Sequence, residues 1–429
     1  MRRLTLRERD ALPIGTDEGL SETEAAAFAR LQPSLPPGSL TWQHRAIRFG
    51  PFCGVLRAGD VTVELLPKID DGQDRNEGAR GLLVAMLRTT GNLTVSSAGE
   101  STLGQQRMHL LDQFILDFCA RVNAALRGGA IAHYQNHEEN LNALRGRLNL
   151  NNHLRQNAFD RSYLFCNFDE RTIDNPHNRA LKAVLAVLRP GAISAHARAT
   201  VAALLHRFDD VALQPVTPQD IARLTFDRMT KSWEPIFERA KWLLQGLFPD
   251  VRSGEMDGTC LLFNMERLFE AFLGAKLRQA WQGTPDGFRI VLQGPQKSLA
   301  QSDAGHAFRL HPDITVLDDG GVVRIFDAKW KRLDPKAPSS GVSPSDVYQL
   351  AAYASRYSCE RVALVYPASV ACPSGLVESY RLAIPCAPIL EVHAVDVREL
   401  GRNGSLPLEL RPPLRADRKS GQRIPEAVA

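Results

Sequence analysis

Two short segments, Pro312-Asp313 and Asp327-Ala328-Lys329, carry the residue types that a phosphodiester-cleaving site needs. Carboxylate oxygens hold Mg²⁺, and an ammonium group beside them can orient the attacking water or neutralise charge on the phosphorane. The pattern is short, and Asp and Lys residues on a hairpin more often form a solvated face. Its setting favours chemistry, because Asp327 and Lys329 interrupt an apolar strand in which an unpaired charge is costly to bury.

A β-hairpin would bring the two segments together. Two apolar runs, residues 308–317 and 322–330, flank the turn-forming tetrad Asp318-Asp-Gly-Gly321. If this tetrad forms the loop, Leu317 pairs with Val322 on the opposite strand. The spacing therefore predicts two antiparallel strands joined by a four-residue turn.

The register of this hairpin decides which side chains meet. Counting back from the turn, Asp313 falls opposite Phe326 and next to Asp327. Because side chains alternate along a strand, Asp327 and Lys329 project from the same face. We therefore predict that Asp313 and Asp327 are catalytic residues that hold Mg²⁺, with the catalytic Lys329 beside them.

An amphipathic helix over residues 262–277 precedes the hairpin, with apolar residues at helical spacing. Glu266 and Glu270 lie four residues apart at the edge of its apolar stripe, so either can turn a carboxylate towards the hairpin. We select Glu270 as the third catalytic and metal-binding carboxylate, with Glu266 as the alternative. An ordinary pair of surface residues explains these two positions equally well.

A second helix is predicted after the hairpin, because Ser343-Pro344 supplies a cap residue and a proline at the first helical position. On this helix Gln349 and Tyr353 share a face with Asp346. Gln349 is the candidate for contacting a phosphate or a metal-bound water, although a plain exposed Gln is the commoner case. Strand patterns follow at residues 361–367, 379–384 and 390–397.

This order of helix, hairpin, helix and strand resembles the PD-(D/E)xK nuclease fold, which many restriction enzymes and resolvases share. The resemblance implies metal ligation by Asp313 and Asp327, with Lys329 beside them and one glutamate from the first helix. Gln349 matches the polar residue that the following helix often supplies. The expected fold class is α/β, or α+β for the chain as a whole, with a restriction-endonuclease-like C-terminal domain.

A closer resemblance, to the McrC family, covers most of the chain. McrC is the nuclease subunit of the McrBC restriction system, which attacks DNA containing modified cytosine. Ala328 departs from the Thr or Ser that is more usual in the family, but its side chain should point away from the metal. The matching segments follow the family's order, at residues 63–69, 144–148, 165–170, 174–185, 265–272, 312–314, 327–331 and 346–350.

The McrC resemblance implies a division of labour between two proteins. The chain would join an McrB-like AAA+ ring that hydrolyses GTP and that recognises and translocates double-stranded DNA, and would stimulate its GTPase. The sequence has no Gly-x-x-x-x-Gly-Lys-Ser/Thr loop, so we expect no nucleotide site in this chain itself. Two alternatives stay open: an adaptor that activates a AAA+ motor with little or no cleavage of its own, and a stand-alone nuclease of DNA repair type.

Charged residues in the middle of the chain have structural explanations. Arg145 and Arg147 flank a glycine, and paired arginines suit carboxylate or phosphate recognition. A solvent-exposed face or an internal ion pair with Asp169 or Glu170 is the structural interpretation that we favour over ligand binding. Asp174 precedes a helical pattern and is expected to cap that helix.

Composition is that of a soluble globular protein and argues against several kinds of site. Of 429 residues, 44% are apolar and 23% charged, and 52 basic against 48 acidic side chains give only +4, too little to indicate nucleic-acid binding. Seven scattered cysteines without a Cys-x-x-Cys pair indicate neither a zinc site nor a disulfide framework. No apolar run reaches membrane-spanning length, so we expect a cytoplasmic protein without a membrane partner.

Composition shifts predict three domains and a tail. Residues 1–100 resemble a β-rich, partner-binding domain, residues 101–255 a mainly helical middle domain, and residues 256–411 the nuclease domain. The stretch 250–258, with two glycines and alternating charge, is the expected linker. Residues 412–429 have the composition of a disordered tail.

Overall fold

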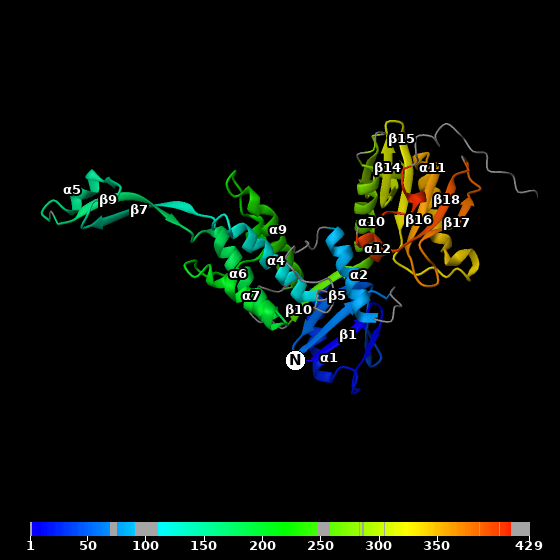
Figure 1. Ribbon diagram of the computed structural model, residues 1–429, viewed down its shortest axis with the longest axis horizontal. Coiled ribbons are helices and arrows are strands. Elements are labelled where there is room, and N and C mark those ends of the chain that lie inside the picture. Colours follow the sequence, from blue (N-terminus) through cyan, green and yellow to red (C-terminus); the bar gives the residue numbers. More distant parts are fainter. Residues whose placement is uncertain are drawn as a thin grey trace, which may run out of the picture. The chain divides into compact units, whose positions relative to one another are not determined.

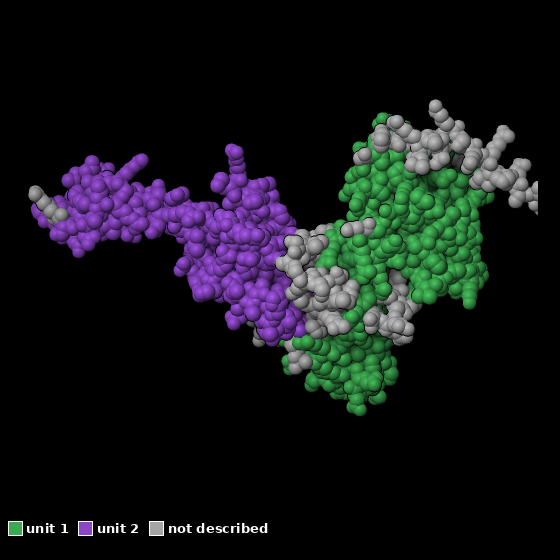
Figure 2. Space-filling view, viewed as in Figure 1, with its two compact units in different colours: residues 1–107, 262–429 green, residues 108–261 purple. Residues whose placement is uncertain are grey.

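The computed structural model mixes helices and strands along the chain, which confirms the predicted α/β class (Figure 1). It forms two compact units, residues 1–107 with 262–429 and residues 108–261 (Figure 2). Residues 248–257, which hold most of the expected linker, and the expected tail from residue 413 lie outside the described part of the chain. The described residues are 2–68, 75–90, 110–160, 162–247, 258–282, 284, 287–303, 305–385, 387–402 and 404–412.

The N-terminal part of the first unit is built on two small sheets, with strand orders β1-β6-β5-β10 and β2-β4-β3. Helix α1 packs on β5 and α2 on β6, so these two strands are buried along nearly their whole length. Helix α2 was not predicted. The bounds are β1 (Arg2–Arg7), β2 (Ala11–Pro13), α1 (Glu22–Leu31), β3 (Leu40–Gln43), β4 (Ala46–Phe49), β5 (Phe52–Ala58), β6 (Val61–Leu66), α2 (Arg75–Thr89) and β10 (Gly258–Asn264).

The C-terminal part of the same unit contains a six-stranded sheet with the order β11-β14-β15-β16-β18-β17. Strands β15, β16 and β18 run parallel to one another, and the remaining pairs are antiparallel. A separate ribbon of β12 and β13 lies between β11 and β14 in the chain. The bounds are α10 (Met265–Trp281), β11 (Arg289–Leu292), β12 (Lys297–Ser302), β13 (Gly305–Leu310), β14 (Ile314–Asp318), β15 (Gly321–Ala328), α11 (Pro344–Tyr357), β16 (Arg361–Pro367), β17 (Gly375–Arg381), β18 (Ile389–Val395) and α12 (Val397–Gly401).

Helices α10 and α11 cover opposite faces of this sheet. On β15, Phe326 packs against Trp281 of α10, with ring centroids 6.4 Å apart. The preceding residue, Ile325, belongs to the core cluster that contains Leu350 of α11. Because neighbouring strand residues point to opposite faces, the two helices sandwich β15 between them.

The helix predicted over residues 262–277 begins later than expected. Residues 262–264 end strand β10, and α10 starts at Met265. The Asn264 side chain accepts the backbone N–H of Arg267 and so caps the helix. The apolar residues of 262–264 extended the helical pattern by chance, since a strand and a helix can share a short apolar run.

The second unit combines helices with a long β-ribbon made of β7 and β9 that extends away from them (Figure 1). The expectation of a mainly helical middle domain missed this ribbon. Its β7 strand is mostly exposed and polar, so it lacks the apolar alternation that identifies a strand in sequence. The bounds are α4 (Leu110–Leu126), β7 (His133–Leu141), β8 (Arg147–Leu148), α5 (Leu150–Gln156), β9 (Leu164–Thr172), α6 (Pro176–Gly191), α7 (Ala195–His206), α8 (Pro218–Ala222) and α9 (Glu234–Leu247).

Within the described ranges, no helix combines the length and the apolar character needed to cross a bilayer.

Candidate active site

The hairpin that carries the candidate residues forms where the sequence predicts it. Leu317 pairs with Val322, as expected. The strands extend one pair further, because Asp318 pairs with Gly321, and the loop between them is shorter than four residues. Gly321 has a φ of 130°, a conformation that a residue with a Cβ rarely adopts, which explains a glycine at this end of the turn.

The predicted register is wrong by one residue beyond a β-bulge. Counted from the turn, the pairing shifts by one residue between Leu317 and Val316. Ile314, and not Asp313, therefore faces Phe326. A bulge places an extra residue on one strand and moves every later pair, which an alternating pattern does not reveal. The shift brings Asp313 level with Asp327 and so draws the two carboxylates closer than predicted.

The two aspartates differ in how their carboxylates are held. Asp313 Oδ2 accepts a 2.9 Å hydrogen bond from the backbone N–H of Ala328. Asp327 is 1% exposed; its Oδ1 has no hydrogen-bond partner among the described residues, and its Oδ2 is paired with the ammonium of Lys329. A buried carboxylate oxygen without a hydrogen bond is energetically costly, so Oδ1 of Asp327 is an unsatisfied acceptor at the site.

Lys329 provides the positive charge beside them. Its Nζ lies 2.7 Å from Oδ2 of Asp327 as an ion pair, and it donates a 3.2 Å hydrogen bond to Oε1 of Gln349 on α11. Gln349 in turn donates to the Tyr353 hydroxyl, which donates to the His311 carbonyl. The lysine is therefore held by one contact on β15 and one on α11, and the structure brings Gln349 to it.

The two glutamates of α10 face different surroundings. Glu270 accepts a hydrogen bond from Gln293, in the segment that follows β11, and lies near enough to Asp327 to feel its charge. Glu266 instead forms a 3.5 Å ion pair with Arg9, and both side chains are exposed. Of the two candidates, Glu270 is the one directed towards the aspartates.

Burial and mutual repulsion shift the pKa of each acidic group. Burial, together with the charge of Asp327, raises the pKa of Asp313 to about 7. Burial also raises the pKa of Asp327, although Lys329 opposes that change, and burial raises the pKa of Glu270. For Lys329, burial lowers the pKa, but its proximity to Asp327 and other carboxylates outweighs that, so the pKa is raised overall. The cluster therefore favours binding of a further cation.

The donor set fits a hard divalent cation such as Mg²⁺. Asp313 and Asp327 offer carboxylate oxygens, and Oδ1 of Asp327 is buried without a hydrogen-bond partner among the described residues. No group of three His, Cys, Asp or Glu side chains arranged to hold a metal occurs among the residues that the structure describes. Mg²⁺ usually keeps several waters and binds one or two carboxylates, so a two-aspartate site suits it. Glu270 as a third ligand stays a prediction.

Two residues at the site were not predicted. Asp346 is buried, accepts a 2.5 Å hydrogen bond from Lys331, and lies 3.9 Å from Lys329 Nζ. The sequence signal that could have identified Asp346 was its position on the same helix face as Gln349. Gln293 connects Glu270 with Asp313, because its side chain donates to the first and its backbone N–H to the carbonyl of the second. No sequence pattern marks Gln293.

The charged residues of the β7–β9 ribbon form internal contacts. Arg145 forms a 3.0 Å ion pair with Glu170, and its guanidinium lies 4.1 Å from the centroid of the Phe168 ring. The predicted ion pair with an acidic residue of this segment is therefore confirmed for Arg145. Gly146, at a φ of 69°, lies too close to the Asn167 carbonyl to accommodate a Cβ.

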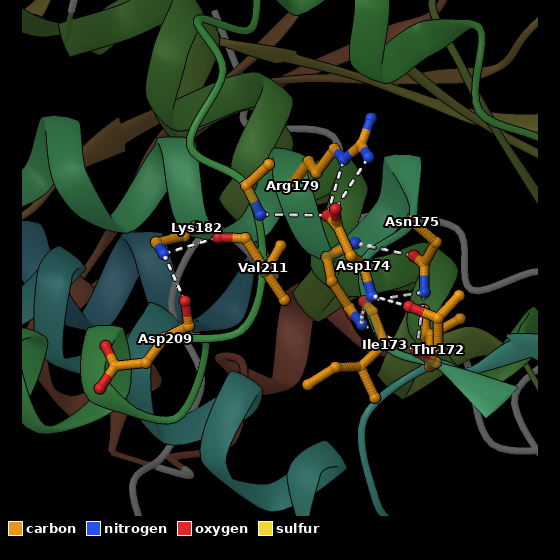
Figure 3. Close-up of polar contacts among 11 residues, drawn as sticks. Thr172, Ile173, Asp174, Asn175, Arg179, Lys182, Asp209 and Val211 are labelled. Carbon is orange, nitrogen blue, oxygen red and sulfur yellow. Dashed lines mark hydrogen bonds and ion pairs between the residues drawn. The ribbon is translucent and has the colours of Figure 1, made fainter. Parts of the chain in front are cut away.

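The expectation that Asp174 caps a helix is wrong. The cap of α6 is Asn175, whereas Asp174 forms an ion pair with Arg179 and accepts the backbone N–H of Ala212 (Figure 3). Lys182 donates to two backbone carbonyls of the same loop. These residues hold a loop against α6.

Comparison with known proteins places the chain in a family. A family model described as McrBC 5-methylcytosine restriction system component matches residues 47–367. The chain belongs to this McrBC family. The matched range contains all five candidate site residues, Glu270, Asp313, Asp327, Lys329 and Gln349. Comparison with curated proteins gives no match.

Solved structures give the same fold. One is a refined half-complex from a tetradecameric assembly of Thermococcus gammatolerans McrB AAA+ hexamers with bound McrC, in which the matching chain has a TM-score of 0.72, 16% identity and 97% coverage of both chains. Another is the Thermococcus gammatolerans McrBC complex, with a TM-score of 0.52, 18% identity and coverage of 65% of this chain and 88% of that one. At these identities the McrBC likeness establishes the fold.

Proposed function

We propose that this chain is the DNA endonuclease subunit of a GTP-dependent, modification-dependent restriction complex and that it cleaves phosphodiester bonds with Mg²⁺. The observation that carries the proposal is the cluster of Asp313, Asp327 and Lys329, in which a buried carboxylate has one oxygen without a hydrogen-bond partner among the described residues and an ammonium 2.7 Å from the other. A PD-(D/E)xK nuclease needs this combination. Membership of the McrBC family is consistent with it.

Each residue has a distinct task in the proposed cleavage. Asp313 and Asp327 would hold Mg²⁺, which when bound neutralises phosphate charge and makes a coordinated water more acidic. Lys329, fixed by Gln349, orients the attacking water and stabilises negative charge on the phosphorane. Water forms a new bond to phosphorus while the bond to the leaving sugar oxygen breaks, and that oxygen takes up a proton. Glu270 completes or tunes the site.

The partner in this proposal is an McrB-like AAA+ ring. The fold is that of chains from McrB hexamer assemblies with bound McrC, and the sequence has no phosphate-binding loop of its own. GTP hydrolysis would therefore come from the ring, and this chain would stimulate it. Recognition of modified cytosine in double-stranded DNA would also lie with the ring. We place the complex in the cytoplasm, where DNA and GTP are present.

Two variants test the assignment. We expect Asp327→Asn and Lys329→Ala to abolish Mg²⁺-dependent cleavage of methylated DNA by the complex, while ring binding and GTPase stimulation stay at the wild-type level. Full cleavage by either variant would rule out the proposed site. If the wild type stimulates GTP hydrolysis but never cuts DNA with Mg²⁺, the chain is an adaptor. Cleavage by the purified chain without ring or nucleotide would indicate a stand-alone nuclease.

A further inference from the structure

A buried hydrogen bond joins the end of the candidate catalytic strand to the N-terminus of the chain. Trp330, the residue after Lys329, donates through its indole Nε1 to Oε1 of Glu8 at 2.8 Å. Trp330 is 4% exposed and Glu8 2% exposed. The other side of the indole packs against Phe269 of α10, with ring centroids 5.3 Å apart. Residues 322 positions apart in the sequence thus meet next to the candidate site.

The same oxygen of Glu8 also binds the backbone of Lys68, which is not one of the candidate site residues. Glu8 Oε1 accepts the backbone N–H of Lys68 at 3.1 Å, and the Lys68 carbonyl accepts a hydrogen bond from Arg332. Lys68 belongs to the motif Val63-Glu-Leu-Leu-Pro67-Lys68-Ile69, one of the segments that resemble the McrC family. The segment that follows β15 is therefore bonded at Trp330 and at Arg332 to the residues that follow strands β1 and β6 of the N-terminal sheet.

The backbone around Glu8 is fixed in an unusual conformation. Arg9 has a φ of 64°, the left-handed region, which costs a non-glycine residue about 1 kcal/mol. Two hydrogen bonds hold the turn: Glu8 N–H donates to the Leu66 carbonyl at 2.9 Å, and Arg9 N–H donates to the Gly50 carbonyl at 3.2 Å. The strained turn directs Glu8 inwards to Trp330 and leaves Arg9 exposed beside Glu266. Strain of this kind persists where the surroundings enforce it.

Among the described residues, only one oxygen of the Glu8 carboxylate has hydrogen-bond partners. Its second oxygen, Oε2, is buried and has no hydrogen-bond partner among the described residues. Burial raises the pKa of Glu8, although the hydrogen bonds from Trp330 and Lys68 oppose that change. If the side chain at this buried position served only to fill space, an apolar residue would do so with a smaller desolvation penalty than a carboxylate. The hydrogen bond from Trp330 to Oε1 therefore indicates a role for Glu8 beyond packing.

We propose that Glu8 is a positioning residue for Asp327 and Lys329, a role that rests on the proposed nuclease function. It fixes Trp330, and with it the end of β15, against the N-terminal sheet. A displacement of a catalytic group by about 1 Å lowers an enzyme's rate on the order of a hundredfold. Without this hydrogen bond the end of β15 would be held less firmly, so we expect cleavage to slow while the chain still folds. The N-terminal sheet is thereby part of the nuclease site.

Four variants of the full chain test this role. Glu8→Ala removes the acceptor and Trp330→Phe removes the donor while keeping an aromatic ring. Glu8→Gln keeps an acceptor oxygen and serves as the conservative rescue. Lys68→Ala is the matched control, because it keeps the backbone N–H that bonds to Glu8 and removes only an exposed ion pair with Asp10.

The readouts are kcat and KM for Mg²⁺-dependent DNA cleavage by the complex, and hydrogen exchange of the peptide covering residues 325–332 in the free chain. We expect Glu8→Ala and Trp330→Phe to lower kcat at least about tenfold, to change KM little, and to speed exchange of that peptide about tenfold, as the loss of a hydrogen bond to a charged group would. Glu8→Gln and Lys68→Ala should stay within about twofold of wild type.

Several outcomes would overturn the proposal. Wild-type kcat and wild-type exchange in both Glu8→Ala and Trp330→Phe would show that the contact positions nothing. An equal loss in Lys68→Ala would show a general weakening of this region. If Glu8→Ala does not fold, Trp330→Phe decides. If the wild type does not cut DNA, the proposed function fails, and the exchange measurement alone decides whether Glu8 holds the strand end.

Discussion

The backbone N–H of Ala328 donates to the Asp313 side chain, so one aspartate is fixed by the strand that carries the other. Asp327 lies beside Ala328 on that strand; its Oδ2 is paired with Lys329, and its Oδ1 has no hydrogen-bond partner among the described residues. The pair is thus asymmetric: one carboxylate is positioned by a backbone N–H, and the other by the ammonium of a side chain.

The stability of the metal-free chain should depend on pH through Asp313. Its pKa is raised to about 7 from 3.8, so between these values the folded state binds a proton that the unfolded state has lost. Stability is therefore greatest at low pH in this window and falls as pH rises from about 4 to about 7, by roughly 1–3 kcal/mol for this partly exposed group. Urea unfolding with a chelator at pH 5 and pH 8 measures the difference. In Asp313→Asn the difference should shrink, and an unchanged pH dependence would contradict the assignment.

Mg²⁺ should stabilise the free chain. A ligand that binds only the folded state adds about 2.7 kcal/mol at a concentration one hundred times its dissociation constant. Asp327→Asn removes the buried charge, so this variant should be more stable than wild type without metal and should gain little from Mg²⁺. Thermal unfolding at pH 8 with Mg²⁺ or with EDTA distinguishes the cases. Equal Mg²⁺ stabilisation of wild type and variant would place the cation elsewhere.

The two glutamates of α10 should differ in effect. Glu270→Gln removes a carboxylate that senses the charge of Asp327, and we expect cleavage by the complex to fall about tenfold or more. Glu266→Gln breaks only an exposed ion pair with Arg9, which is worth at most about 1 kcal/mol, and should leave cleavage unchanged. Measuring cleavage rates of both variants at saturating Mg²⁺ tests the choice. The reverse order would assign the role to Glu266.

The Asp174 contacts should stabilise the second unit without taking part in cleavage. Hydrogen bonds from Arg179 and Ala212 lower the pKa of Asp174 to about 2, from 3.8. The stabilisation is present above pH 4 and is lost as pH falls from about 4 to about 2. Asp174→Asn should therefore lower the urea midpoint at pH 7, and its difference from wild type should vanish near pH 2. A variant that matches wild type at pH 7 would show that the loop is held by other contacts.

The sequence by itself determined the elements of the candidate site. A turn tetrad between two apolar runs predicts a hairpin, and helical periodicity places Glu270 and Gln349 on helices at either side of it in the chain. These signals are local, because each depends on the spacing of residues within one element. The structure therefore contains the predicted helices and strands, although α10 starts later and the strand predicted at residues 379–384 is β17 at Gly375–Arg381; the candidate residues lie close together.

Only the tertiary structure decided the contacts between elements. A bulge in the hairpin moved Asp313 level with Asp327, and a polar, exposed ribbon gave no apolar alternation to reveal itself. The bond between Glu8 and Trp330 joins positions 322 apart, a separation at which no periodicity can act. Such contacts arise from how packed elements fit together, and neighbouring residues in the chain do not encode them separately.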